Sequence, residues 1–440
     1  MSSNLRTKVH GGMRSAMSLL PESSRHAIFR RMVDCDPAPD ERLQIRIADT
    51  RPELEACFRL LHDAYVASGF MKPHPSGLRV TPYHALPTTT TIAAFWEGEV
   101  VGTLSMIREG VFGFPLQSVF DLSAVRAQPG RIAEISALAV HPKFRSTGGK
   151  ILFPMMKFMH DYCVQYFDTR HIVIAVNPSK IELYESLLFF RRLQAAEVDH
   201  YDFANGAPAV GATLDLHEVP TLFKHGYEGR PPRKDLHQYF VVSKLANARL
   251  PSRRYFTTND PVMTPALLDY FFTQRTDCFA QLDERRLGLL HSIYDNTEYA
   301  AVLPPLPHGQ QAGGAVLRRH PRYSLKCPAV LTLADQPRPL EVVELSQHGF
   351  QAHGPNDLQP GARGWLKVML GEGVESTVIA EVVRRVPTAA GHYHGFRVEA
   401  PDAAWLRCVR LLETGSTHAD LAAETQPPAA AADGSRRHAA

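Results

Sequence analysis

The stretch that decides the fold of this 440-residue chain is Arg131-Ile-Ala-Glu134-Ile-Ser136-Ala-Leu138-Ala-Val140-His-Pro142-Lys-Phe-Arg145-Ser-Thr-Gly148-Gly149-Lys150. Its first half alternates with a period of two, which predicts a β-strand with Ile132, Glu134, Ser136, Leu138 and Val140 on one face. Pro142 ends the strand, and two glycines precede a long helical pattern. Because the first N–H groups of a helix lack intrahelical partners, this turn can hold an anion. A carboxylate beside an anion-binding turn indicates group transfer.

The segments on either side of this stretch predict an α/β domain. A strand begins at Leu43, a helix follows Asp49, and residues 91–96 and 100–107 form a hairpin. A helix over 150–167, a buried strand over 171–176 and a helix capped by Asn177 come next. This order predicts at least one parallel pair of strands. The long Pro-, Gly- and His-rich segment 68–91 is expected to form a lid or a substrate wall.

The composition is that of a globular protein with more than one domain. The hydrophobic share is 44%, and the formal net charge of +3 gives no support to a general affinity for nucleic acid. The six cysteines form no Cys-x-x-Cys pair, so we expect reduced, buried thiols without a disulfide framework or a zinc site. The sequence shows no apolar run of membrane-spanning length and no signal peptide, so a cytoplasmic location is expected.

Changes in pattern divide the chain into five segments. Residues 1–42 are expected to be a poorly ordered leader, and the alternative is an amphipathic surface helix that touches a membrane or another domain. Residues 43–303 form the α/β domain with a helix-rich extension, and residues 304–315 form a linker. Residues 316–413 show short strands of even spacing, which predict a small barrel or sandwich, and residues 414–440 form a disordered tail.

The α/β domain resembles the GNAT acyltransferase superfamily. The resemblance rests on the turn around Arg145, Gly148 and Gly149 and on Asn177 followed by Tyr184. The strand Glu134-x-Ser136-x-Leu138-x-Val140 is similar, more narrowly, to that of acyl-homoserine-lactone synthases and their relatives, the N-acyl amino acid synthases. The segment 255–265, the later Arg275-Thr276 and the Leu-Pro ending near Leu303 resemble the extension of the latter group.

This resemblance implies transfer of a long-chain acyl group from a thioester to an amine. Glu134 would act as the base, and Tyr184 would protonate the departing thiolate; a structural ion pair for Glu134 and an aromatic packed under the sheet for Tyr184 are the alternatives. Six residues would bind the acyl donor: Ser136, Arg145, Gly148, Gly149, Lys150 and Asn177. The superfamily usually has Gly or Ala where this chain has Lys150, which argues against ordinary CoA docking. The family implies acyl carrier protein as the donor, with acyl-CoA as the alternative and no covalently bound cofactor.

The C-terminal segment resembles the PilZ domain, whose ligand is cyclic di-GMP. The family's Arg-x-x-x-Arg motif corresponds to Arg318-Arg319-His-Pro-Arg322, and its Asp/Asn-x-Ser-x-x-Gly motif corresponds to Glu344-Leu-Ser346-Gln-His-Gly349. Guanidinium groups can grip phosphate and the O6 and N7 edge of guanine. Glu344 stands where the family has Asp or Asn, so the carboxylate is displaced by one methylene. His392 and His394 are expected to be surface residues, and no metal site is predicted.

Three functional hypotheses follow from these resemblances. The first is an N-acyl amino acid synthase-like transferase that uses acyl carrier protein and an amino acid or similar amine, under the control of cyclic di-GMP. The second is a degenerate transferase that serves as a cyclic di-GMP receptor. The third is a lactone synthase that makes a diffusible signal. All three place the protein in the cytoplasm, and peripheral contact with the inner membrane face stays open.

Overall fold

The computed structural model describes residues 20–110, 112–145, 147–251, 260, 262–294, 297–306, 322–355, 357–371, 373–388 and 391–414. These residues belong to two compact units, a larger α/β unit and a β-barrel formed by the C-terminal part of the chain. The predicted tail over 415–440, most of the linker, the motif residues 252–259 and 261, and both Arg318 and Arg319 lie outside the described residues.

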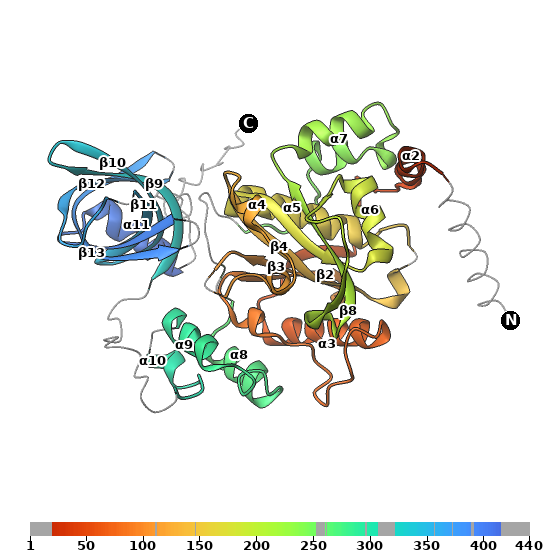
Figure 1. Cartoon of the computed structure of the whole chain (residues 1–440), viewed down its shortest axis with the longest axis horizontal. Coiled ribbons are helices and arrows are strands. Elements are labelled where there is room, and N and C mark those ends of the chain that lie inside the picture. The colour runs from red at the N-terminus through yellow and green to blue at the C-terminus, as the bar shows by residue number, and fades with distance from the viewer. Residues whose placement is uncertain are drawn as a thin grey trace, which may run out of the picture. The chain divides into compact units, whose positions relative to one another are not determined.

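The larger unit is built on one twisted sheet with the strand order β1-β2-β3-β4-β5-β8-β6, and β7 pairs with β8 (Figure 1). β4 and β5 run parallel, as the sequence predicts, and the other described pairs are antiparallel. The strands are β1 (Leu43–Ile47), β2 (Thr89–Trp96), β3 (Glu99–Arg108), β4 (Arg131–Val140), β5 (Thr169–Val176), β6 (Arg191–Arg192), β7 (Val198–Tyr201) and β8 (Ala207–Asp215).

Helices cover both faces of this sheet (Figure 1). One face packs on α5 (Leu152–Phe167), α6 (Pro178–Leu188) and α7 (Val219–Tyr227), and the other packs on α3 (Arg51–Ala67) and the extension. α5 lies close to the sheet because Gly102 of β3 has no side chain: an added Cβ would lie 2.5 Å from Met155 Sδ. The buried methionines Met155 and Met159 of α5 belong to this core.

Local signals in the sequence set the ends of these elements. Thr50 caps α3 in a capping box with Glu53, and the Asn177 side chain accepts a hydrogen bond from Ser179 N (3.0 Å) at the start of α6. The β2–β3 hairpin turns through Glu97 and Gly98, which have φ values of +53° and +89°. A two-residue turn with both φ values positive fits the twist of a hairpin. The predicted hairpin and both predicted helix starts are therefore confirmed.

The extension contains short helices that contribute to the same core as α3: α8 (Pro265–Asp269), α9 (Glu284–Ile293) and α10 (Thr297–Ala300). Glu55 of α3 accepts hydrogen bonds from the Tyr270 hydroxyl (2.7 Å) and from Arg275 Nη1 (2.8 Å). Buried Asp260 accepts bonds from Tyr162 (2.8 Å) and Thr90 (3.1 Å). These polar contacts fix the extension to the sheet domain.

The expectation of a poorly ordered leader does not hold for residues 20–42. Residues Glu22–Met32 form α2, which packs on α6, and Arg30 Nε donates to Ser186 O (2.8 Å). Cys35 is buried in the sheet core, and its amide donates to Arg233 O (2.7 Å). This second half of the predicted leader is part of the α/β unit because it buries apolar side chains there.

The facing of β4 also differs from the simple alternation predicted for it. Ala137 has φ +55°, and the pairing with β3 shifts between Thr103 and Ser105, so two β4 residues lie opposite one residue of β3. Ile132 lies in the core on the α3 face, whereas Leu138 and Val140 pack in the core on the α5 face. A bulge inserts one residue and therefore exchanges the two faces beyond it.

The C-terminal unit is a closed barrel with the strand order β10-β11-β14-β13-β12-β9, accompanied by α11 (Ala403–Thr414) (Figure 1). The strands are β9 (Tyr323–Leu333), β10 (Gln336–Ser346), β11 (Gly349–Gly354), β12 (Arg363–Gly371), β13 (Val374–Thr388) and β14 (Gly391–Val398). The sequence prediction missed β11, which is short and begins directly after the turn. His394 is fully buried and hydrogen-bonded to Pro355 O (3.0 Å), so its predicted surface position is wrong.

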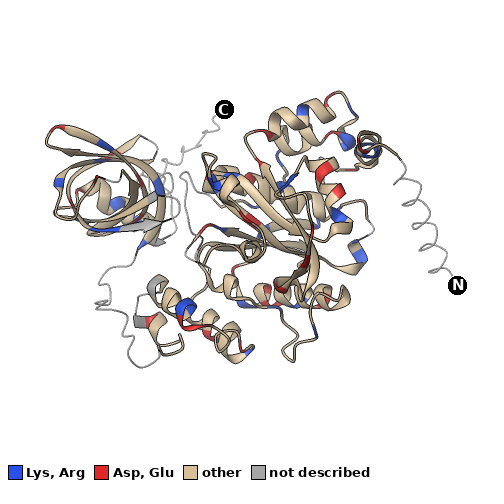
Figure 2. Ribbon diagram, viewed as in Figure 1, with Lys and Arg blue, Asp and Glu red and all other residues tan. Residues whose placement is uncertain are grey.

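The described cysteines are all free and buried, as predicted. Acidic and basic residues are interspersed on the helices of the α/β unit (Figure 2), in keeping with the balanced composition. Among the described residues, none of the helices combines the length and the apolar character that a bilayer span requires. The same part of the chain contains no group of three or more His, Cys, Asp or Glu side chains that could hold a metal ion.

Candidate active site and ligand sites

The sheet opens directly beyond Glu134. The parallel ladder between β4 and β5 runs from Arg131–Thr169 to Glu134–Val173. Past this point, the described part of β4 pairs with β3, and β5 pairs with β8. Polar backbone groups on this side of β4 are therefore available to a molecule that enters between the two strands. The glycine turn at 148–149 and the start of α6 follow these two strand ends along the chain.

The side chain of Glu134 is buried, and its carboxyl group has one backbone amide as its hydrogen-bond partner. Its exposed fraction is 1%, and its Oε2 accepts a hydrogen bond from Leu116 N at 3.1 Å. Burial raises the pKa of Glu134 to about 8, against a smaller lowering by the Leu116 amide. No arginine is among the causes of this shift, so the structural ion pair considered for Glu134 is not formed by the described residues. A carboxyl group with this pKa can exchange a proton near neutral pH.

Three phenol groups interact electrostatically with Glu134, and an arginine stacks on one of them. Burial is the largest cause that raises the pKa values of Tyr65, Tyr83 and Tyr201. The charge of Glu134 raises each of these pKa values further. Arg79 lies over the Tyr65 ring at 4.1 Å. None of these four residues was singled out from the sequence. Arg79 and Tyr83 do lie in the long loop expected to form a substrate wall, and that loop was the available signal.

A buried hydrogen-bonded pair lies on the same face as Glu134. His84 Nδ1 accepts from Thr81 N (3.0 Å), so Nε2 carries the proton and donates to Ser105 Oγ at 3.2 Å. Burial lowers the pKa of His84 to about 3, so this histidine stays neutral. Ser105 lies opposite Ser136 in the β3–β4 pairing. Ser136, a predicted donor-binding residue, is therefore held beside the bulge.

Tyr184 lies on the other side of the sheet from Glu134. It extends from α6, packs against the core on the α5 face, and meets the Phe190 ring edge-on at 5.7 Å. Burial raises the pKa of Tyr184, so its hydroxyl stays protonated at neutral pH. The aromatic packing foreseen as the alternative is thus present. A role in proton transfer remains a prediction.

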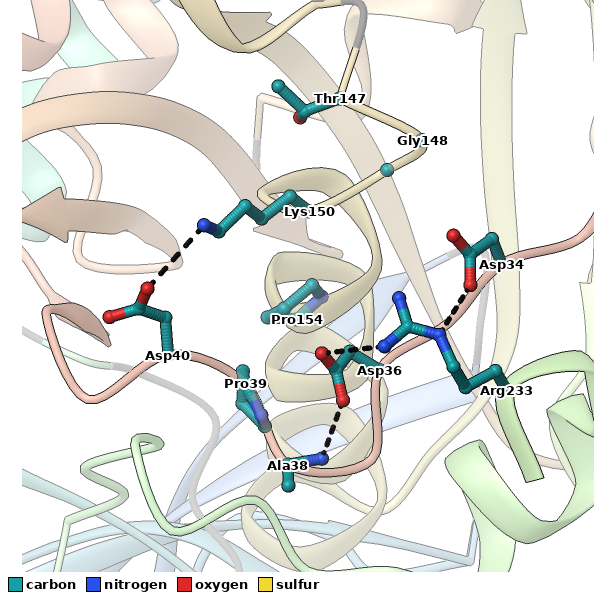
Figure 3. Close-up of a pocket in the computed structure, with 11 residues that line it drawn as sticks. Asp34, Asp36, Ala38, Pro39, Asp40, Thr147, Gly148, Lys150, Pro154 and Arg233 are labelled. Atoms are coloured by element: carbon teal, nitrogen blue, oxygen red, sulfur yellow. Dashed lines mark hydrogen bonds and ion pairs between the residues drawn. The ribbon is translucent and has the colours of Figure 1, made fainter.

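The predicted donor turn forms one wall of a pocket of about 410 Å³ (Figure 3). Gly148 and Gly149 have φ values of +66° and +89°, which glycine adopts without strain. Lys150 lines the pocket, whereas the exposed Arg145 turns back to donate from Nε to Val140 O at 2.8 Å. Asn177 serves as the cap of α6. The structure thus gives Arg145 and Asn177 local roles in closing turns.

The opposite wall of this pocket is acidic, which the sequence did not indicate. Asp40 lies 3.6 Å from Lys150 Nζ, while Arg233 bonds to Asp34 (2.8 Å) and Asp36 (3.1 Å) (Figure 3). The hydrogen bond from Arg42 holds the pKa of Asp40 well below its usual range, with a smaller contribution from Lys150. The cations of the pocket are therefore already neutralised by carboxylates that come from residues 34–40.

In the barrel, the second predicted ligand motif forms a tight turn. Ser346 pairs with Gly349, and Ser346 Oγ donates to Gly349 O (3.1 Å). A Cβ at Gly349 would lie 2.6 Å from the backbone oxygen of Phe396, so only glycine fits there. Arg322 Nη1 donates to Glu344 Oε2 at 2.9 Å. The structure thus brings Arg322 and Glu344 together.

Comparison with known proteins gives the following matches. Residues 56–215 match the profile of the N-acyl amino acid synthase FeeM, and residues 317–413 match the profile of the PilZ domain. The solved FeeM structure, from uncultured soil microbes, shares 25% identity over 41% of this chain and 94% of its own, with a TM-score of 0.35. No curated protein matches the chain.

Two further solved structures are similar to parts of the chain. The CoA-dependent acyl-homoserine lactone synthase BjaI has 20% identity over 43% of this chain and 92% of its own, with a TM-score of 0.33. The PilZ domain of YcgR from Escherichia coli, solved with c-di-GMP, has 21% identity over 25% of this chain and 98% of its own, with a TM-score of 0.20.

The raised pKa of Glu134 predicts a pH dependence of stability. Its folded-state pKa of about 8 lies above the ordinary value of 4.5, so the folded state binds the proton more tightly. Glu134 therefore favours folding below about pH 4.5, and this contribution is lost as the pH rises towards 8. We expect the Glu134→Gln variant to gain stability relative to the parent protein over this interval, by a few kcal/mol at most. Urea unfolding of both proteins from pH 5 to 9 measures the difference, and a difference that does not change with pH would contradict the assignment.

Proposed function

We propose that this chain is an acyltransferase similar to the N-acyl amino acid synthases, joined to a domain of the PilZ kind, and we propose its substrate class and control ligand. The α/β unit transfers a long-chain acyl group from an acyl-carrier-protein thioester to the amino group of an amino acid. The barrel binds cyclic di-GMP and controls this transfer. The observation that carries the proposal is the buried Glu134, which forms no ion pair with the described residues, at the point where the β4–β5 ladder ends.

The chemistry of amide formation fits this arrangement. The acceptor enters as an ammonium ion, and Glu134 takes one proton directly or through a water molecule, which leaves the neutral amine. The amine attacks the thioester carbonyl, and backbone N–H groups of β4 beside the bulge stabilise the oxyanion. The C–S bond then breaks, and the Tyr184 hydroxyl gives its proton to the departing thiolate. The extra proton on the new amide nitrogen returns to the Tyr184 phenolate, and Glu134 releases to solvent the proton that it took from the ammonium ion. The products are an amide, a free thiol and one proton.

The charge of the donor pocket favours a carrier-protein donor over CoA. Lys150 and Arg233 face Asp34, Asp36 and Asp40, so a strongly anionic donor must displace carboxylates or lie against them. The phosphopantetheine of a carrier protein has a single phosphodiester, whereas CoA adds a pyrophosphate and a 3′-phosphate. A CoA donor would therefore have to exchange with more of these ion pairs than a carrier-protein donor would, and each exchange costs free energy.

The barrel supports the proposed ligand through its two motifs. Arg322 is paired with Glu344, which comes two residues before the Ser346–Gly349 turn. A guanidinium at this position can bind phosphate or a guanine edge. The YcgR domain of the same family was solved with c-di-GMP. Control of the transferase requires that the ligand bind two states of the whole chain with different affinities.

The transfer reaction is tested with purified chain, an acyl-carrier thioester and a panel of amino acids. We expect amine-dependent thiol release that rises with pH and levels off above about pH 8, because Glu134 must be ionised to act as the base. Glu134→Gln should lower the rate by about 10²–10⁴-fold, whereas Glu99→Gln, at an exposed position on β3, should retain it. Mass analysis of the product separates a linear amide from a lactone. A folded parent protein with no turnover on any acceptor would sink the proposal.

The donor preference is tested by removing one carboxylate from the pocket. Asp40→Asn should lower the KM for acyl-CoA by a small factor, up to about fivefold, because solvent weakens the interactions of an exposed charge, and it should change the KM for the acyl-carrier donor less. Asp335→Asn makes the same charge change in a left-handed turn of the barrel, where asparagine is tolerated, and should change neither value. Equal effects of Asp40→Asn on both donors would argue against charge selection.

Binding of cyclic di-GMP is tested by calorimetry on the full-length chain. Arg322→Ala should weaken binding by about tenfold or more, since a hydrogen bond to a charged group contributes about 1.5–3 kcal/mol. Arg363→Ala, which removes an exposed guanidinium paired with Glu399 elsewhere on the barrel, serves as the matched control. Glu344→Asp restores the shorter acidic side chain of the family motif and should tighten binding. Identical affinities for the parent protein and Arg322→Ala would refute this site.

A further inference from the structure

The indole of Trp405 joins the C-terminal helix of the barrel to the predicted ligand turn. Trp405 lies on α11 and is fully buried in the barrel core. Its Nε1 donates a hydrogen bond to Ser346 O at 3.0 Å. An indole has this one donor and no acceptor, so the bond satisfies its whole hydrogen-bonding capacity. Ser346 belongs to the motif for which cyclic di-GMP is the proposed ligand, so α11 is tied directly to that site.

Trp405 contacts the turn at both of its ends. Ser346 and Gly349 face one another where β10 meets β11, and Trp405 bonds to the first of these strands. On the second strand, the Trp405 ring meets the Phe350 ring edge-on, with centres 5.8 Å apart. Phe350 in turn stacks on Phe396 at 4.3 Å, and the backbone oxygen of Phe396 lies against Gly349. Trp405 and Phe396 therefore fix the turn from the core side, and a ligand would meet it from its outer side.

The position of the Trp405 ring is itself set by the cap of α11. Asp402 Oδ1 accepts hydrogen bonds from Trp405 N (2.7 Å) and from Ser376 Oγ (3.0 Å), while Oδ2 accepts one from Thr377 N (3.0 Å). An aspartate that caps a helix in this way fixes where the helix begins. Because Ser376 and Thr377 belong to β13, the start of α11 is attached to a strand. A break of the bond to Ser346 therefore requires a movement of α11 or a rotation of a fully buried ring.

Packing alone does not require a tryptophan at this position. A phenylalanine would occupy most of the same space in the apolar core, and it would lack only the indole N–H and part of the ring. The specific contribution of Trp405 is thus the hydrogen bond to a backbone oxygen of the turn. Loss of such a partner away from water is unfavourable, and the turn can recover that loss only by changing its conformation.

We propose that Trp405 is a positioning residue for cyclic di-GMP. Its indole N–H fixes the Ser346 carbonyl and so holds the Ser346–Gly349 turn in the conformation that binds the ligand. Coupling of this kind is reciprocal: if the bond favours the ligand, the ligand strengthens the bond by the same factor. α11 therefore responds to the occupation of the turn. This inference rests on the proposed binding of cyclic di-GMP and deepens it, because it names the element by which the barrel senses its ligand.

The first test compares two tryptophan-to-phenylalanine variants of the full-length chain by calorimetric titration with cyclic di-GMP. Trp405→Phe removes the indole N–H and should weaken binding by about two- to tenfold, the effect of one neutral hydrogen bond. Trp365→Phe makes the same change at a ring on β12 that is 59% exposed, and it should leave the affinity unchanged. Thermal unfolding of each variant shows whether it folds like the parent protein.

A double variant separates an effect on the turn from general support of the barrel. Ser346→Ala removes the hydroxyl that bonds to Gly349 O and should itself weaken binding. If Trp405 acts through the same turn, Trp405→Phe should reduce the affinity less in the Ser346→Ala background than in the parent protein. Equal factors in both backgrounds, or no effect of Trp405→Phe on the affinity, would overturn the proposal and leave the binding of cyclic di-GMP standing.

The parent protein provides a measurement that does not depend on the folding of a Trp405 variant. The chain has three tryptophans, and isotope labelling of the indole nitrogens gives one N–H signal for each in a magnetic resonance spectrum. Trp96→Phe and Trp365→Phe assign the Trp405 signal by elimination. Saturation with cyclic di-GMP should shift this signal and slow its exchange with solvent by about two- to tenfold, as reciprocity requires. An unchanged Trp405 signal in the saturated protein would refute the coupling, whereas a parent protein that binds no cyclic di-GMP would overturn both this inference and the proposed control ligand.

Discussion

The structure depends most on the burial of the Glu134 carboxyl group at the place where the β4–β5 ladder ends. A carboxyl group in water is ionised at neutral pH, and pairing with a cation lowers its pKa further. Here, burial with one backbone amide as partner moves the pKa to about 8. The β4–β5 ladder ends at Glu134, so this carboxyl group lies beside the part of β4 that does not pair with β5. The proposed amide formation uses both features.

A second principle is common to both candidate anion sites. Lys150 and Arg233 face Asp40, Asp34 and Asp36 in the donor pocket, and Arg322 is paired with Glu344 in the barrel. An incoming phosphate must therefore exchange with a carboxylate of the chain. The binding free energy is then the difference between two ion pairs, which makes it smaller and more dependent on the charge and shape of the ligand. Arg79, without such a carboxylate among the described residues, differs from these cations.

The sequence predicted those elements in which local chemistry and periodicity agree. The capped helices, the β2–β3 hairpin, the parallel pair and most barrel strands follow from signals within a few residues. The sequence could not predict which face of the sheet the β4 side chains beyond Ala137 occupy. A bulge leaves the alternation of residue types in the sequence unchanged, but it moves the side chains that follow to the opposite face. The burial of His394 and the packing of residues 20–42 also depend on contacts with distant segments.

The residues of the candidate site also differ in whether the sequence alone could identify them. Glu134 could be recognised because it interrupts an apolar strand, and Gly349 because it stands in a spaced motif. Arg79, Tyr65 and Tyr201 come from a loop, a helix and a strand end that are separated by more than a hundred residues in all. Their meeting depends on the path of the chain. The acidic wall of the donor pocket was hidden for the same reason, since Asp34, Asp36 and Asp40 lie in what resembled a leader.

The gap between β4 and β5 also explains why additional elements surround this sheet. Hydrogen bonds that normally hold neighbouring strands together are missing beyond Glu134, and Ala137 adopts a left-handed conformation that is unfavourable by about 1–2 kcal/mol for a residue with a Cβ. The helices on both faces must therefore hold the gap open. On one face, the extension fixes α3 through Glu55, Tyr270 and Arg275. On the other face, α2 fixes α6 through the bond from Arg30 to Ser186. The two peripheral elements thus brace the two helices that flank the candidate site, and they stabilise a sheet whose central ladder is incomplete there.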